Sequence, residues 1–238
     1  MSCRASTPSR FRSTTWQSST LLPSKPRSTT LGGHMIVKTA FLGSTMQLRV
    51  ELRDITPSIW RRLAVPAELT LDVLHDVLQV AFGWTDSHLH DFHLAGVRFG
   101  MPDVEDELLL VDERAAPIGA VAAQGAVFLY RYDYGDDWEH DITVESISEP
   151  GPGPIVVECL EGARACPPED CGGPPGYENL LRVLADPTDE EHRDMKRWVG
   201  RGFDSERLDL DKLNKKLRVI GRRFERGTRS ARGIRRIR

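Results

Sequence analysis

The sequence predicts an α+β fold, mainly an antiparallel sheet with an N-terminal helix and a helical C-terminal third. Residues 46–65 and 127–145 contain segments in which apolar and polar side chains alternate, as they do in half-buried strands. Residues 71–82 and 177–220 repeat apolar side chains at helical spacing. Because strands and helices are grouped along the chain and do not alternate, a doubly wound parallel sheet is excluded.

The chain begins with a segment that has no core pattern. Residues 1–34 are rich in Arg, Ser and Thr, and contain five basic and no acidic residues. They also lack the apolar stretch of a secretory signal. We expect residues 1–45 to be disordered or to be a spurious N-terminal extension; in the second case residues 1–34 lie upstream of a true start at Met35.

Two strands and a helix are expected next. Residues 46–53 (MQLRVELR) alternate, and residues 59–65 (IWRRLAV) return after a turn that contains Pro57, which is most simply an antiparallel pair. Thr70 is the expected N-cap of a helix over residues 71–82, and Gly83 is its expected end.

The His-rich segment 84–93 (WTDSHLHDFH) offers a candidate metal site. If the segment is a strand, His88 and His90 share one face. Two imidazoles at this spacing, with a carboxylate, could bind zinc or a similar metal, although the spacing is not a diagnostic motif. A polar strand face is the commoner alternative.

The most distinctive stretch is YRYDYGDDWEHD at residues 130–141, which holds three of the four tyrosines. Residues 127–132 favour a strand, residues 134–137 have turn chemistry, and residues 138–145 alternate again. These features predict a hairpin with an acidic, aromatic tip. Such a tip could hold a ligand or a cation, or it could be a hydrogen-bonded sheet corner. Before it, residues 108–111 could add a short strand.

A loop dense in proline and glycine follows the hairpin. Residues 155–159 (IVVEC) predict a buried strand, and CPPEDCGGPPGY occupies residues 166–177. Cys159, Cys166 and Cys171 lie within thirteen residues, but not at the spacing of a zinc ribbon. With His140 they could form a Cys₃His site, and a rigid loop with buried thiols is the favoured alternative.

Three helices are expected in the C-terminal third. The first covers residues 177–185 and stops at Pro187. The second begins at a capping box formed by Thr188 and Glu191. The last begins at Asp204 or Asp209.

The charge of the chain is strongly segregated. Residues 35–217 carry 18 basic and 34 acidic residues, a net charge of −16, whereas residues 218–238 carry nine Arg and one Glu. An acidic core repels nucleic acid, but a basic tail can bind nucleic acid or another acidic partner by itself. A solvated tail is an equally acceptable interpretation. The nucleic-acid candidates are Arg222, Arg223, Arg226, Arg229, Arg232, Arg235 and Arg236.

Two further sets of candidate site residues result. The ligand or pocket candidates are Tyr132, Asp133, Asp136, Trp138, His140, Glu169 and Asp170. The metal candidates are His88, His90, His140, Cys159, Cys166 and Cys171. No catalytic residue is assigned, because the sequence contains no Walker A, GxGxxG, GxSxG or HExxH motif. Without a membrane span or a disulfide framework, we expect a cytoplasmic protein with reduced thiols.

Several segments, in order, resemble the plasmid pRiA4b ORF-3-like family. They include HLHDFHL, YRYDYGDDWEHDITVE and CLEGARACPPEDCGGPPGYENLLRVLADP, and the similarity covers about residues 46–217. Members of this bacterial-type family are described as insertion-element passenger proteins, and sometimes as TnpR-like. The resemblance implies a compact α+β domain at 46–217, followed by a basic tail at 218–238, and it implies no settled chemistry.

The sequence does not support a resolvase mechanism. None of the serines in the fold lies in an Arg-rich constellation, and the acidic core opposes DNA docking. We therefore expect a non-catalytic binding or accessory module associated with plasmids or mobile elements. The alternatives are a metal-binding protein or metal-dependent hydrolase, and nucleic-acid association through the basic tail.

Overall fold

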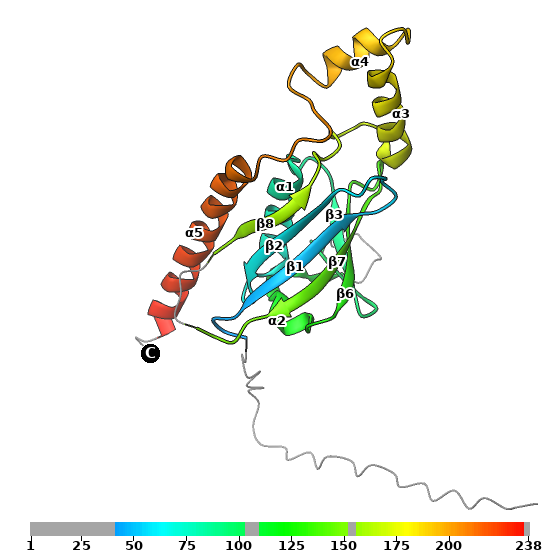
Figure 1. The fold of residues 1–238 in the computed structure, drawn as a ribbon. Coiled ribbons are helices and arrows are strands. Elements are labelled where there is room, and N and C mark those ends of the chain that lie inside the picture. Colours follow the sequence, from blue (N-terminus) through cyan, green and yellow to red (C-terminus); the bar gives the residue numbers. More distant parts are fainter. Residues whose placement is uncertain (1–40, 103–109, 152–155, 236–238) are drawn as a thin grey trace, which may run out of the picture. The chain divides into compact units, whose positions relative to one another are not determined.

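The computed structural model describes residues 41–102, 110–151 and 156–235, with side chains up to Thr228. Eight strands lie in one sheet (Figure 1). Their bounds are β1 (Thr45–Leu52), β2 (Trp60–Pro66), β3 (His90–Leu94), β4 (Val97–Gly100), β5 (Val111–Asp112), β6 (Val127–Tyr132), β7 (Trp138–Ile147) and β8 (Glu158–Ala163). The strand order is β5-β4-β3-β6-β7-β1-β2-β8. Every neighbouring pair is antiparallel except β4 and β5.

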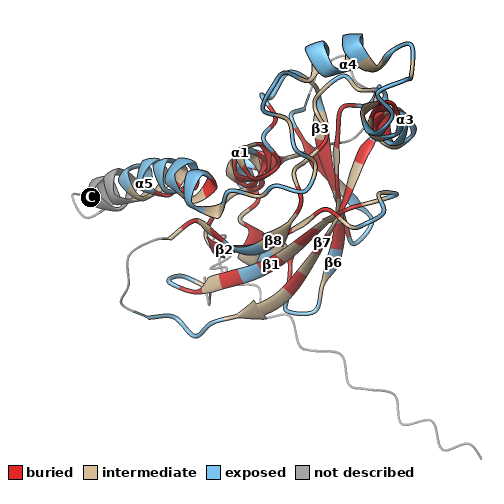
Figure 2. Cartoon of the chain, turned by 45° about the horizontal axis from the view of Figure 1, so that its top comes forward, coloured by how far each residue is buried: buried red, intermediate tan, exposed pale blue. Residues whose placement is uncertain are grey.

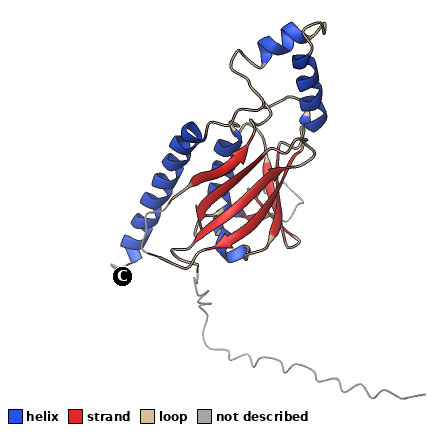
Figure 3. Ribbon diagram, viewed as in Figure 1, coloured by secondary structure: helices blue, strands red, loops and turns tan. Residues whose placement is uncertain are grey.

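The helices are distributed between the strands and after them (Figure 3). They are α1 (Leu71–Phe82), the 3₁₀ turn η1 (Glu113–Ala115), α2 (Ile118–Val121), α3 (Gly173–Ala185), α4 (His192–Trp198) and α5 (Leu210–Arg235). In the described ranges, no helix combines the length and apolar character that crossing a bilayer requires.

The predicted pairings around β1 and in the hairpin are confirmed. Strands β1 and β2 pair antiparallel, and Leu48 and Val50 are buried as the alternation predicts. Strands β6 and β7 form the predicted hairpin, with Tyr132 opposite Trp138. The alternation of apolar and polar side chains in these segments therefore predicted the strands and their buried faces correctly.

Helix α1 is also confirmed at its C-terminal end. Gly83 adopts φ +82° and donates its N–H to the carbonyl of Gln79, as a left-handed C-cap does. At the other end, Thr70 makes no side-chain capping bond. Helix α1 buries Leu74, Val77 and Leu78 in the core and packs against α5 (Figure 2).

The prediction of a helical C-terminal third is wrong. Helices α1 and α2 are interspersed among the strands, and β8 extends the sheet to Ala163. Strand β8 starts later than the strand expected at 155–159 and continues to Ala163, because it pairs with β2 through Glu161 and Gly162. After it, the helices are separated by loops at 186–191 and 199–209. The sheet and these loops thus take up much of the region expected to be helical.

Two local predictions also fail. Residues 84–89 form a loop, and only residues 90–94 of the His-rich segment are a strand, so His88 and His90 do not share a strand face. Thr188 forms no capping box, because its N–H and hydroxyl both donate to Asp186 Oδ1, and the N-cap of α4 is Glu191. Side-chain turns compete with helix capping at such positions.

Helix α5 begins where Asp209 Oδ1 accepts the N–H of Lys212, one of the two predicted starts. It continues without a break across residue 217, the expected boundary of the basic tail. The expected disorder of residues 1–45 falls mostly outside the described residues.

Candidate functional site

The tip of the hairpin is held by one aspartate. Asp133 adopts φ +57°, and its Oδ1 accepts the N–H groups of Gly135 at 2.9 Å and Asp136 at 3.3 Å. Its backbone carbonyl accepts the N–H of Asp137 at 2.6 Å. The turn therefore occupies Oδ1 of Asp133 and leaves Oδ2 available.

The loop at residues 166–172 is joined to this tip by two hydrogen bonds. Tyr132 donates its hydroxyl to Glu169 Oε1 at 2.6 Å, and the N–H of Gly172 donates to Asp136 Oδ2 at 3.1 Å. Gly173, at φ +68°, lies so close that a Cβ would be 2.3 Å from the carbonyl oxygen of Asp136. The two most distinctive stretches of the sequence thus lie against each other.

Their junction brings His88 between two carboxylates. His88 Nε2 lies 3.1 Å from Asp170 Oδ1 and 3.5 Å from Asp133 Oδ2. This buried nitrogen has no hydrogen-bond partner among the described residues. An N–H bond at Nε2 would therefore not point at either carboxylate oxygen with hydrogen-bond geometry. We call His88, Asp133 and Asp170 the His88 cluster. Their ligand atoms all lie within 4.8 Å of one another.

A second histidine group lies in the interior, where hydrogen bonds satisfy it. His75 Nδ1 is 2.8 Å from the Tyr130 hydroxyl, and His75 Nε2 is 2.9 Å from Asp86 Oδ1. His90 Nε2 is 3.0 Å from Oε2 of the buried Glu113. Burial, with a smaller contribution from the neighbouring His90, lowers the pKa of His75 to about 4.

The second group is also unsuited to hold one metal ion between its histidines, although ligand atoms of His75, Asp86 and His90 lie within 4.8 Å of one another. The His75 and His90 rings are stacked 3.5 Å apart and only 6° from parallel. Imidazole lone pairs lie in the plane of the ring. The lone pairs of two parallel stacked rings therefore do not converge on one point where a metal ion could bind both. We interpret this group as a structural network.

Trp138 and His140 lie in the core, and neither belongs to the His88 cluster. They are 1% and 0% exposed. Complete burial lowers the pKa of His140 to about 3, and its ring packs edge-on against Phe82 and Trp84. His140 therefore stays neutral at physiological pH and serves as a core aromatic residue.

The three described cysteines are protonated thiols, and none joins a metal group. Burial raises the pKa of Cys166 and of Cys171 to about 12, and also raises that of Cys159. Arg61 donates to Cys166 Sγ at 3.2 Å. Neither group of metal-ligating side chains in the described part of the chain contains a cysteine. Because metal binding needs thiolates, this setting disfavours the Cys₃His arrangement.

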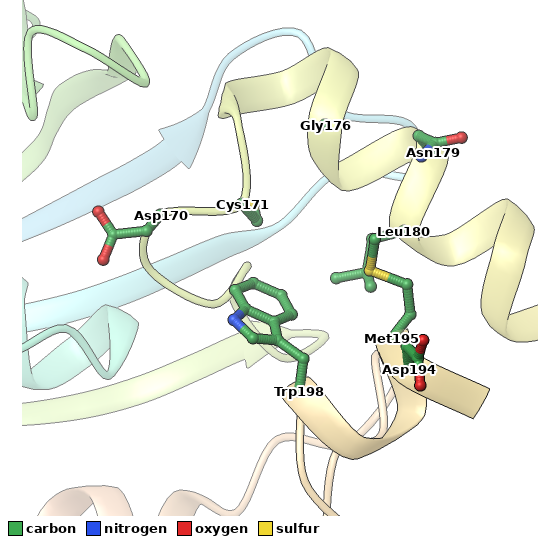
Figure 4. Close-up of a pocket in the computed structure, with 8 residues that line it drawn as sticks. All are labelled: Asp170, Cys171, Gly176, Asn179, Leu180, Asp194, Met195 and Trp198. Carbon is green, nitrogen blue, oxygen red and sulfur yellow. The ribbon is translucent and has the colours of Figure 1, made fainter. Parts of the chain in front are cut away.

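A pocket of about 370 Å³ adjoins the His88 cluster and shares Asp170 with it (Figure 4). Leu180 of α3 and Met195 and Trp198 of α4 supply its apolar wall, and Cys171 faces it from the loop. Trp198 is 50% exposed. An apolar group next to the cluster could therefore find a concave surface.

The predicted nucleic-acid residues lie far along α5. Arg222, Arg223 and Arg226 are exposed. The backbone of Arg229, Arg232 and Arg235 continues the helix, but their side chains lie outside the description, as does all of Arg236.

Comparisons with known proteins agree with the resemblance found in the sequence. A family model described as plasmid pRiA4b ORF-3-like protein matches residues 44–212. The chain is 39% identical, over 191 residues, to the uncharacterized protein y4hQ of Sinorhizobium fredii (strain NBRC 101917 / NGR234), covering 79% of this chain and 98% of that protein. It also resembles the crystal structure of MM3350, a protein of unknown function from Methanosarcina mazei Go1, with 35% identity and a TM-score of 0.66 over 71% of this chain and 97% of that one. The chain thus belongs to the plasmid pRiA4b ORF-3-like protein family.

Proposed function

We propose that this protein is a non-catalytic binding module whose ligand is a divalent metal ion held by the His88 cluster. One observation carries the proposal: a buried imidazole nitrogen lies beside two carboxylate oxygens and hydrogen-bonds to neither. A buried polar atom without a partner is costly, and a cation between the three side chains removes that cost.

The distances within the cluster support a shared ion. Bonds from a metal to imidazole nitrogen and carboxylate oxygen are about 2.1 Å long, so two ligands of one ion lie about 3.0 Å apart at right angles and about 3.4 Å apart in a tetrahedron. The His88 nitrogen lies 3.1 Å and 3.5 Å from the two oxygens. The side chains therefore need little rearrangement to coordinate.

The electrostatic setting also supports a cation. The Asp133 side chain is only 10% exposed. Among the described residues, no Lys or Arg lies within ion-pair distance of Asp133 or Asp170. Two carboxylates and one imidazole suit manganese, iron or zinc better than calcium, which prefers oxygen ligands alone.

A further carboxylate, that of Glu169 next to Asp170 in the sequence, supports a non-catalytic role. Glu169 accepts the Tyr132 hydroxyl and both the N–H and the hydroxyl of Thr85. Burial raises the pKa of Glu169, but these hydrogen bonds outweigh burial and lower the pKa below its ordinary value. A carboxylate so engaged is a weak general base for a metal-bound water.

A metal-dependent hydrolase is the alternative function. Three protein ligands leave coordination positions for water, and the pocket beside Asp170 offers a place for a substrate. The association with plasmids or mobile elements stays a prediction that rests on the family description.

Metal titration of the full chain tests the proposal. After treatment with a chelator, the wild-type protein is expected to bind one Mn²⁺ or Zn²⁺ ion per chain in calorimetry. Asp133→Asn keeps an oxygen at the position of the turn acceptor Oδ1 but replaces the charged carboxylate with a neutral amide, which is a weaker metal ligand. We therefore expect the affinity for the metal to fall roughly 100-fold or more.

Asp137→Asn is the matched control. Asp137 lies on the same turn, also at φ +57°, but its carboxylate pairs with Arg131. This variant should bind metal like the wild type. Equal affinity in the two variants, or no binding by the wild type, would contradict the proposal.

A further inference from the structure

Helix α5 has one buried face and one strongly basic face. Leu213, Leu217 and Gly221 are buried, and the helix packs on α1 and β8. Among the side chains that the structure describes, seven basic residues are exposed on the remaining surface: Lys212, Lys215, Lys216, Arg218, Arg222, Arg223 and Arg226. Four of these, Lys212 to Arg218, were not among the sequence-based candidates.

The basic residues form a stripe. At about 100° per residue, all of the seven except Arg218 fall within about 120° of the helix circumference, opposite the buried face. At about 1.5 Å per residue, the stripe from Lys212 to Arg226 is about 21 Å long. We call these seven residues the α5 stripe. Val219 is the large apolar side chain exposed within it.

The α5 stripe lacks the ion pairs found elsewhere on the surface. In the described ranges, none of its seven side chains lies within 4.0 Å of a carboxylate, whereas Arg182, Arg193 and Arg197 on α3 and α4 all pair with aspartates. A face on which basic charges without ion pairs predominate attracts a polyanion.

We infer that the α5 stripe binds the phosphate backbone of nucleic acid, independently of the metal proposed at the His88 cluster. Cationic side chains that recur at every turn of a helix can contact successive phosphates of a linear polyanion. A membrane surface fits less well, because the apolar face of α5 is already buried against α1 and β8.

Fluorescence anisotropy with a labelled 30-base-pair duplex of random sequence, titrated with the full chain at several salt concentrations, tests this inference. The test variant replaces Lys215, Lys216 and Arg222 with Gln. Arg223 is left intact, because its charge also acts on Asp76 of α1. We expect at least tenfold weaker binding in about 0.1 M salt, and a salt slope that is smaller by roughly 2 to 3.

The matched control replaces Arg193, Arg197 and Arg207 with Gln, an equal change in net charge at exposed sites. It should bind DNA nearly as the wild type does. Equal weakening in both triple variants would show that only net charge matters and would overturn the inference. So would wild-type binding to phosphatidylserine vesicles but not to DNA, or self-association in sedimentation that the test variant abolishes.

Discussion

Replacing Arg61 with leucine is expected to lower the free energy of unfolding by about 4 kcal/mol. Arg61 is 2% exposed and lies on the core-facing side of β2. Its guanidinium donates to the carbonyls of Trp60, Ala81, Ala163 and Arg164, at 2.8 to 3.1 Å. Without it, several buried carbonyls in β2, α1 and β8 lose their donor, and this cost exceeds the gain from an apolar side chain.

Chemical denaturation measures this effect, and Arg62→Leu is the control. Arg62 is the next residue in β2, but it points to the other face, where it pairs with Glu145 and Glu161. Ion pairs near the surface contribute little, so this variant should lose much less stability. Equal losses in the two variants would show that the buried hydrogen bonds of Arg61 do not stabilise the fold.

Acidification from pH 7.5 to pH 5 is expected to remove about 4 kcal/mol of stability through two histidines, about 2 kcal/mol from each. Burial lowers the pKa of His75 to about 4 and that of His140 to about 3, from an ordinary value of 6.5. Below pH 6.5 these two imidazoles bind protons in the unfolded chain but stay largely unprotonated in the folded chain. Their stabilisation is therefore complete above pH 6.5 and declines as the pH falls toward the folded values.

Denaturation of wild type and His140→Leu at both pH values isolates one of these contributions. The variant should lose about 2 kcal/mol less than the wild type over this interval, since carboxylates contribute equally to both proteins. The same pH-dependent loss in both would contradict the assignment of His140 as a buried neutral residue.

Local patterns predicted the local structure well. Alternation identified β1, β2 and the β6–β7 hairpin, and Gly83 marked the end of α1. The same alternation places Arg61 on the face of Leu63 and Val65, so its burial could have been predicted, although it was not.

The His88 cluster could be predicted only in part. His88, Asp133 and Asp170 were all candidates, but the sequence grouped His88 with His90 on one strand, whereas residues 84–89 form a loop that directs His88 elsewhere. Asp133 and Asp170 are brought to His88 by the contacts of Glu169 with Tyr132 and of Gly172 with Asp136. Such contacts between distant loops leave no periodic signal in a sequence.

Crystals of the full chain soaked in Mn²⁺ give the most direct test of the metal proposal. Anomalous scattering locates the ion without assumptions about ligands. A single strong peak is expected about 2.1 Å from His88 Nε2, with oxygens of Asp133 and Asp170 at similar distances. A peak between His75 and His90, or no peak near His88, would contradict it.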